Sequence, residues 1–280
     1  VAERAPHAIP GAELFLDHVH PTVEAHRLLA VALLERLREE GFVTPVPGFG
    51  EEAVAQVEAR VLGRVDREAH GFAMARLARV LAWAGKLEDA HGAAERAVAL
   101  APERAETHRQ LAAAADLLGR TAEAIAAYRR VLELEPDDAL AHSNLAVALE
   151  REGELAGAVV HHRIAVARGS EGVRERSRAA LWPILVELGE RAYREGDAAG
   201  AARVLNEAND LDPGNPGILR RLGVAFLALE RVDDAVRALG AAAALDPDSP
   251  TIHDRHALAL ALTGRVEEAA AAYRRAVQLA

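Results

Sequence analysis

The first residues along the chain that could take part in chemistry lie in the segment FLDHVHPT, Phe15 to Thr22. Asp17 and His20 are three positions apart, and Pro21 follows the histidine. An imidazole can take a proton from a serine hydroxyl while a carboxylate orients its ring, as in hydrolytic triads. The four serines of the chain all lie in or beside a later helical region, and none has a turn suited to a nucleophile. A base and an orienting acid give little catalysis without a nucleophile and oxyanion-hole donors.

This segment and the apolar stretch after it resemble the C-terminal block of the SGNH (GDSL-like) hydrolases. In that family a strand end is followed by Asp-x-x-His-Pro and a closing helix. The resemblance implies that Asp17 and His20 are the orienting acid and the base of a serine esterase or acyl hydrolase. It also implies that residues 1–40 are the remnant of an α/β domain. Because no Gly-Asp-Ser nucleophile block precedes Val1, we expect this chain alone to be inactive and interpret it as the C-terminal part of a larger protein.

The composition narrows the classes of function. A net charge of −10 argues against a nucleic-acid binder, which needs a basic surface to replace the counterions of phosphates. The chain has no cysteine, which excludes disulfides and thiolate metal sites. No uninterrupted apolar stretch is long enough to span a membrane, and no signal peptide is visible. A soluble, cytoplasmic protein is the default expectation, although the sequence does not indicate the compartment.

A motif recurs through most of the chain, and it is centred on a glycine in GKLEDA at Gly85 and GRTAEA at Gly119. Apolar residues on both sides of each such turn have helical spacing, which predicts two helices per repeat. A proline such as Pro136 is expected to end the second helix, since it has no N–H to donate. The predicted repeats are 71–104, 105–138, 139–172, 182–215, 216–249 and 250–280.

This pattern resembles the tetratricopeptide repeat over residues 71–280. The marked leucine of the first helix is met by Leu77, Leu111, Leu145, Leu188 and Leu222. The alanine at the close contact between helices is met by Ala90, Ala124, Ala158, Ala201, Ala235 and Ala269. The resemblance implies an all-α fold, a right-handed superhelix (α-solenoid) of six helix pairs in which neighbouring pairs share one core.

Besides residues 1–40, three segments fall outside the repeats. Residues 41–50 are rich in proline and glycine and predict a linker, while residues 51–70 predict a lead helix that covers the end of the first repeat. Residues 173–181 are an insertion that we expect to lengthen the first helix of the fourth repeat by about two and a half turns. The insertion is either a partner-specific feature or tolerated surface.

Several histidines raise the question of a metal site. His108, His142 and His253 occupy a first-helix position where the family usually has a bulky aromatic residue. They lie a repeat apart, too far to share one ion at about 2.1 Å per bond. His161 and His162 are adjacent on a helix and point to different sides, so we expect partly exposed structural residues. No metal and no cofactor are therefore expected.

The concave groove of such a solenoid is lined by the first helices, and there we expect the function. The repeat pattern places on this groove Arg76, Arg79, Arg109, Gln110, Asn144, Arg220, Arg221 and Arg255. Because guanidinium groups bind carboxylates bidentately, an acidic peptide or protein is the expected partner. The alternative is that these arginines pair with acidic residues on the same face, namely Glu106, Asp116, Glu150, Glu187 and Glu190.

The sequence therefore predicts a non-catalytic protein-protein interaction module. The alternative is the C-terminal part of an SGNH-type hydrolase whose repeats help to select the substrate. The last repeat ends at Ala280 without a polar capping helix. An apolar face exposed there would be covered by further repeats or by a second copy of the chain, so self-association is a further expectation.

Overall fold

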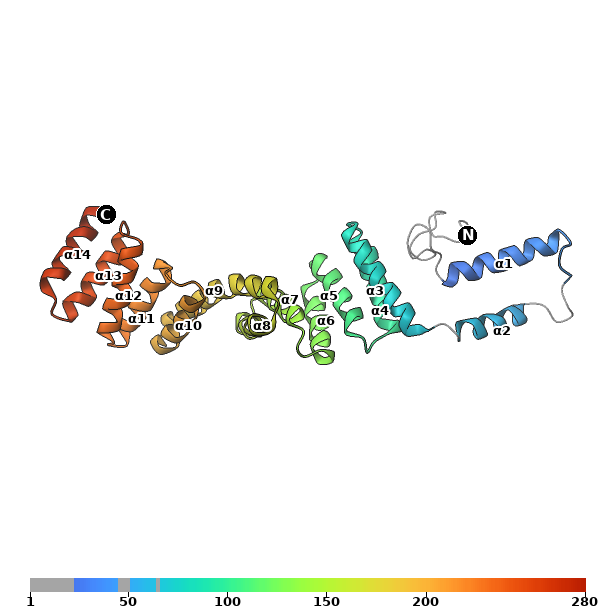
Figure 1. The fold of residues 1–280 in the computed structure, drawn as a ribbon, viewed down its shortest axis with the longest axis horizontal. Helices are drawn as coiled ribbons and strands as arrows, with labels where there is room; N and C mark the ends of the chain where they lie inside the picture. The colour runs from blue at the N-terminus through green and yellow to red at the C-terminus, as the bar shows by residue number, and fades with distance from the viewer. Residues whose placement is uncertain (1–22, 45–50, 64–65) are drawn as a thin grey trace. The chain divides into compact units, whose positions relative to one another are not determined.

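The computed structural model describes residues 23–44, 51–63 and 66–280, and Asp17 and His20 lie outside these ranges. Fourteen α-helices and no strands occur in the described residues (Figure 1). The helices are α1 (Val23–Glu39), α2 (Glu51–Leu62), α3 (Arg67–Trp83), α4 (Leu87–Leu100), α5 (Ala105–Leu117), α6 (Thr121–Leu134), α7 (Ala139–Arg151), α8 (Leu155–Arg168), α9 (Glu171–Arg194), α10 (Ala198–Leu211), α11 (Pro216–Ala228), α12 (Val232–Leu245), α13 (Pro250–Leu262) and α14 (Val266–Leu279).

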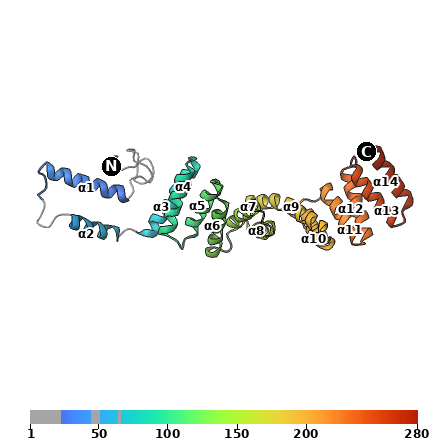
Figure 2. The same ribbon diagram turned by 180° about the vertical axis from the view of Figure 1, so that it is seen from behind.

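The predicted all-α fold of six helix pairs is confirmed. Each of the pairs α3–α4, α5–α6, α7–α8, α9–α10, α11–α12 and α13–α14 packs as a helical hairpin, and Figure 2 shows the same hairpins from behind. The chain divides into two compact parts, an N-terminal unit of residues 1–136 and a C-terminal unit of residues 137–280. Within each unit the second helix of one repeat packs on the first helix of the next, for example α4 on α5 and α12 on α13.

The hairpin turns owe their geometry to the residue between the two helices. Gly119 has a φ of 73° and Gly264 a φ of 77°, in the left-handed region that glycine adopts without steric cost. In the fifth repeat Glu230 takes this position with a φ of 58°, the one non-glycine residue with positive φ among those described. Just beyond the turn, the predicted close contact is present, since Ala124 and Ala235 are completely buried.

The helix predicted over residues 51–70 is divided in two. α2 ends at Leu62, and Arg67 begins α3, the first helix of repeat 1. Asp66 explains the new start, because its carboxylate accepts hydrogen bonds from the backbone amides of Glu68 (3.0 Å) and Ala69 (3.1 Å). The role of residues 51–70 as a cap of repeat 1 stays a prediction.

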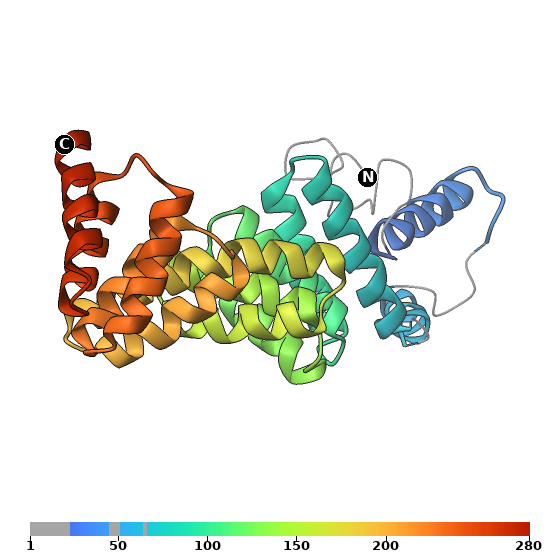
Figure 3. The same ribbon diagram turned by 60° about the vertical axis from the view of Figure 1, so that its left-hand side comes forward.

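The insertion at 173–181 lengthens a helix, as predicted. α9 has 24 residues, whereas α7 and α11, the corresponding helices of the neighbouring repeats, have 13 each (Figure 3). Pro183 lies inside this continuous helix. The added part is anchored, because the buried hydroxyl of Ser177 donates a hydrogen bond of 2.9 Å to the hydroxyl of Ser143 on α7.

The histidines serve the packing between helices. His108 and His253 each form a hydrogen bond from Nε2 to a proline carbonyl just before their helix, at 2.8 Å to Pro102 and 2.9 Å to Pro247. In both repeats the imidazole thus ties the start of the first helix to the loop before it.

The neighbouring histidines of repeat 3 differ from each other in their surroundings. His161 is half-buried and contacts His142, with 2.8 Å between the two Nδ1 atoms. His162 was expected to be partly exposed but is completely buried, and neither ring nitrogen has a hydrogen-bond partner. Burial and the nearby His161 lower the pKa of His162 to about 4. The adjacent positions point to different sides of α8, as expected.

None of the helices in the described ranges combines the length and the apolar character that crossing a bilayer requires.

Candidate functional site: an arginine-lined pocket

The arginines predicted for the groove of the N-terminal unit lie in two different electrostatic settings. Arg76 and Arg79 on α3 are exposed, and no ion pair joins either of them to another described residue. Arg109 on α5 forms ion pairs with Glu106 and Glu135, the latter at 2.8 Å. The alternative of local charge pairing is therefore correct for Arg109 but not for Arg76 and Arg79.

The other predicted groove residue of repeat 2 is also occupied. Gln110 donates a hydrogen bond of 2.9 Å from Nε2 to Glu106, so both predicted residues of α5 share one carboxylate. In the C-terminal unit, Asn144 lies half-buried on α7, next to the buried Ser143. Neither Gln110 nor Asn144 lines the pocket described next.

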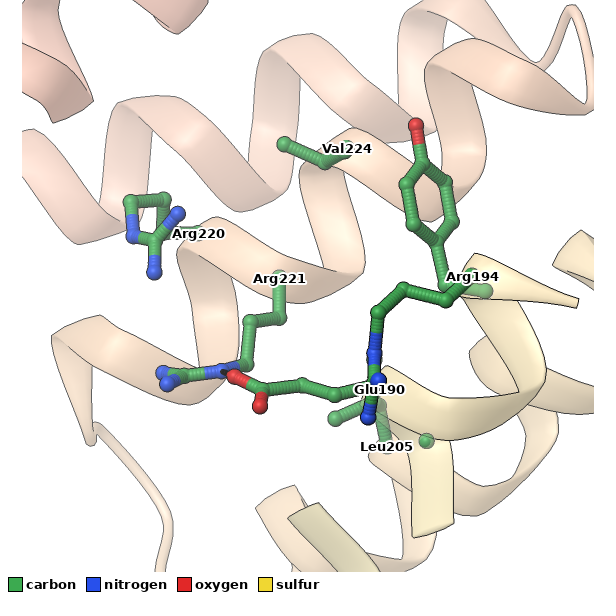
Figure 4. A pocket seen from close by; sticks show the side chains of 8 residues that line it. Glu190, Arg194, Leu205, Arg220, Arg221 and Val224 are labelled. Atoms are coloured by element: carbon green, nitrogen blue, oxygen red, sulfur yellow. Dashed lines mark hydrogen bonds and ion pairs between the residues drawn. The ribbon is translucent and has the colours of Figure 1, made fainter. Parts of the chain in front are cut away.

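The C-terminal unit has a cavity of about 220 Å³ between the fourth and fifth repeats (Figure 4). Helices α9 and α11 contribute most of the wall, and one leucine of α10 completes it. The lining residues are Gly189, Glu190, Tyr193, Arg194, Leu205, Arg220, Arg221 and Val224. Two of the arginines predicted from the repeat pattern, Arg220 and Arg221, are thus brought together in one pocket with a third, Arg194.

Charge compensation in this pocket is incomplete. Arg221 forms an ion pair with Glu190 and also donates a hydrogen bond of 3.0 Å to the carbonyl of Gly217. Arg220 is half-buried and has no ion-pair or hydrogen-bond partner among the described residues. Three guanidinium groups therefore face a single carboxylate, and the pocket has an excess of positive charge in a protein of net charge −10.

The surroundings of Arg220 make its charge costly. Burial lowers the pKa of Arg220, the neighbouring Arg221 and Arg255 lower it further, and Glu190 opposes them. Arg255, on α13, is thus electrostatically linked to the pocket, although it also lies 3.9 Å from the carboxylate of Asp254. A bound carboxylate would relieve this repulsion, because it adds the negative charge that the pocket lacks.

The sequence pattern did not identify Tyr193 and Arg194 as groove residues. Both lie at the end of α9, beyond the insertion that lengthens this helix. The repeat register could have indicated both residues, because they lie in the last turn of the first helix of repeat 4, just before the turn at Gly196. They line the pocket together with Arg220 and Arg221 of repeat 5.

One group of potential metal ligands lies elsewhere. In the N-terminal unit, His91, Glu95 and Glu123 form the only set of three or more such side chains found within the described ranges. The sequence did not predict this group, because Glu123 comes from the repeat after the one that contains His91 and Glu95.

Comparison with sequence families identifies the repeat. Tetratricopeptide repeat models match residues 75–134, 117–153 and 192–260, which together make up more than half of the chain. The matched residues include α9 from Ala192 onward and all of α11, which form two walls of the pocket. Among curated protein sequences, none matches this chain.

Solved structures to which this chain is similar include MamA, the P58(IPK) TPR domain and YrrB. The MamA protein is 17% identical, and the match covers 62% of this chain and 91% of that one, with a TM-score of 0.41. The P58(IPK) TPR domain is 19% identical over 77% of this chain and 60% of that one, with a TM-score of 0.40. YrrB, described as a TPR protein with an unusual peptide-binding site, is 18% identical over 66% and 91%, with a TM-score of 0.44.

Proposed function

We propose that this chain, which belongs to the tetratricopeptide repeat family, is a non-catalytic protein-interaction module that binds an acidic peptide segment of a partner protein. The observation that carries the proposal is Arg220, a half-buried arginine with no ion-pair or hydrogen-bond partner among the described residues, in a pocket that also contains Arg194 and Arg221. Retaining an uncompensated buried cation is costly unless a ligand supplies the counter-charge.

The pocket suggests how a peptide would bind. Arg220 and Arg194 would each donate hydrogen bonds to a carboxylate of the ligand, and Arg221 would remain bound to Glu190. Val224 and Leu205 offer apolar contacts, and Tyr193 adds a ring with a polar end. A short motif with two acidic residues beside an apolar one therefore fits the chemistry of this pocket.

A peptide-display selection tests this proposal. A random heptapeptide library is selected on the wild-type chain and on a variant with Arg194→Gln and Arg220→Gln. Wild type should enrich peptides with two or more acidic residues, and the variant should lose that enrichment. Arg237→Gln is the control, because this exposed arginine of α12 pairs with Asp234 away from the pocket. Equal enrichment by the wild-type and double-variant chains would contradict the proposed site.

The predicted arginines of the N-terminal unit form a second part of the proposal. Arg76 and Arg79 on α3 are exposed without an ion pair in the described residues, so they are available to a ligand. Arg76→Glu together with Arg109→Glu should weaken the binding of a selected acidic peptide and leave helicity by circular dichroism unchanged. Unchanged affinity would remove Arg76 and Arg109 from the interaction surface.

A second candidate function concerns residues 1–40. The motif Asp17-x-x-His20-Pro21 supports a role for this segment as the C-terminal end of an SGNH-type hydrolase. On this proposal the nucleophile lies in a preceding part of the parent protein, and the repeats help to select its substrate. The chain alone should hydrolyse p-nitrophenyl acetate no faster than buffer. Hydrolysis that disappears in His20→Ala would instead place a complete catalytic site within the chain.

Self-association is a third, separate proposal. The helix α14 exposes Val266, Tyr273 and Val277, and Val277 has 77% of its surface accessible. A second copy could cover these side chains, which would remove apolar surface from water. Light scattering coupled to size-exclusion chromatography should show a dimer that Val277→Glu converts to a monomer. A wild-type monomer at about 100 μM would exclude this contact.

A further inference from the structure

A histidine and two glutamates converge between the first two repeats. His91 and Glu95 lie four residues apart on α4 and so share one face of that helix. Glu123 reaches the same place from the first turn of α6. His91 Nε2 lies 2.7 Å from Glu123 Oε1, and His91 Nδ1 lies 3.7 Å from Glu95 Oε2. One potential ligand atom of each residue is within 4.8 Å of the others.

The local charge favours a cation. Glu88 adds a third carboxylate, which binds Arg120 at 2.8 Å, and Arg120 also lies 4.0 Å from Glu123. Three carboxylates thus face one positive side chain when the imidazole is neutral. His91 itself is only 5% exposed, so its ring is held in place by the packing of the two repeats.

Arg120 does not occupy the position where an ion would bind. Its Nη1 lies 3.3 Å from Nδ1 and 3.4 Å from Nε2 of His91. Nearly equal distances to both ring nitrogens indicate that the guanidinium lies over the ring and not along either lone pair. An ion at Nε2 would take the place of the hydrogen in the contact between His91 and Glu123.

We propose that His91, Glu95 and Glu123 bind one divalent transition-metal ion, with Zn²⁺ as the probe, and that the ion links repeats 1 and 2. Zn²⁺ accepts imidazole nitrogen and carboxylate oxygen at about 2.0–2.2 Å and tolerates three protein ligands with water in the fourth position. Mg²⁺ prefers six oxygen ligands and retains its waters, so it should bind poorly. The proposal is independent of peptide binding, because the ligands come from second helices, whereas the arginine pocket lies mainly on first helices.

Calorimetric titration tests the site directly. The full chain, freed of any polyhistidine tag and stripped with a chelator, should bind one Zn²⁺ at pH 7.5. Glu95→Gln and Glu123→Gln keep the shape of the side chains and should each weaken the affinity about tenfold or more. Glu133→Gln removes the same charge from an exposed position of the same helix as Glu123, where it pairs with Arg130, and should change the affinity less than twofold.

Arg120→Gln gives a prediction of the opposite sign. Removing the neighbouring positive charge should strengthen Zn²⁺ binding severalfold. Unchanged or weaker Zn²⁺ binding in Arg120→Gln would indicate that these residues form only a network of ion pairs. His161→Gln should leave the single Zn²⁺ in place, which separates this site from the contact between His142 and His161.

Thermal unfolding supplies a second measurement. Saturating Zn²⁺ should raise the Tm of the wild-type chain by several degrees, because the ion binds the folded state only, and should not raise that of Glu123→Gln. Absent binding, or equal Zn²⁺ affinity in wild type, Glu95→Gln and Glu123→Gln, would overturn the proposal.

Discussion

Repeat 2 of the N-terminal unit and repeat 5 of the C-terminal unit have the same helical frame but use the groove positions differently. In repeat 2, Arg109 is neutralised by Glu106 and Glu135. In repeat 5, Arg220 has no ion-pair partner within the described part of the chain, and Arg221 forms an ion pair with Glu190. The two repeats therefore have similar arginines at these positions but different numbers of carboxylates that pair with them, and we propose a binding site where carboxylates are fewer.

The same two repeats also differ where their helices cross. At corresponding positions, repeat 2 has the buried Ala112 and Tyr128, whereas repeat 5 has the buried Gly223 and Leu239. A Cβ added to Gly223 would lie 2.3 Å from Cγ of Leu239, far below van der Waals contact. In repeat 5 the glycine is thus matched in size to Leu239, which leaves no room for a Cβ at position 223.

The largest expected effect tests this size matching. Gly223→Ala should lower the free energy of unfolding by about 3 kcal/mol, because Leu239 has no space to move away without loss of packing. Ala112→Gly in repeat 2 should cost only about 1 kcal/mol, the usual difference in helix propensity. Chemical denaturation of both variants measures the contrast. Equal costs would show that Leu239 adapts easily and that the matching is not required.

A histidine fills the corresponding position in repeat 3 and extends the comparison to pH. His162 has a folded pKa of about 4, below its value of about 6.5 in an unfolded chain. Below pH 6.5 the unfolded state binds the proton and the folded state does not, so stability falls as the pH is lowered towards 4. The expected loss is about 2 kcal/mol.

Replacing this histidine by the residue of repeats 4 and 5 provides the control. His162→Leu installs the side chain found as Leu205 and Leu239 and should remove this part of the pH dependence. Urea denaturation of both proteins at pH 7 and pH 4.5 measures it. An unchanged slope of stability against pH in His162→Leu would contradict the assignment.

A smaller effect concerns the carboxylates that pair with Arg221 in repeat 5 and with Arg109 in repeat 2. Glu190→Gln removes the carboxylate that competes for Arg221 and should strengthen binding of an acidic peptide about threefold to tenfold. Fluorescence anisotropy with a labelled peptide from the display selection measures the change. Glu106→Gln, which removes one of the two carboxylates that pair with Arg109 in repeat 2, is the matched variant. Weaker binding in Glu190→Gln would mean that Glu190 holds Arg221 in its binding position.

The smallest expected effect concerns the turns. Glu230 has a φ of 58°, whereas Gly119 has a φ of 73° in the corresponding turn of repeat 2. Glu230→Gly should stabilise the protein by about 0.5–1 kcal/mol, since the relief of backbone strain exceeds the added freedom of the unfolded chain. Differential scanning calorimetry should show a rise in Tm of a few degrees. A lower Tm would indicate that the Glu230 side chain contributes more than the strain costs.

The sequence predicted the frame well because its signals are local and recur. Gly119 and Ala124 define a turn and a close contact within a few residues, and each repeat gives the same information again. The lengthening of α9 was predictable for the same reason, since the nine residues before Trp182 contain no residue that ends a helix.

The sites were less predictable because they depend on contacts between repeats. Arg109 and Arg220 look alike in sequence. Only the packing shows that Glu135 pairs with Arg109, whereas no carboxylate in the described ranges forms an ion pair with Arg220. Likewise, His91 and Glu95 are visible as an i, i+4 pair, but Glu123 joins them from the next repeat. Side-chain burial such as that of His162 depends on which neighbour covers it, and the repeat pattern does not specify this.

The hydrogen bond between Ser177 and Ser143 has a consequence for how such arrays change by recombination. Repeats are commonly gained, lost or exchanged as single hairpins, and a breakpoint between α8 and α9 would be the obvious place to separate the third hairpin from the fourth. Here that exchange would leave a buried hydroxyl without its hydrogen-bond partner on each side, which would lower the stability by about 1–3 kcal/mol for each group. These two hairpins should therefore be inherited, and grafted, as one cassette.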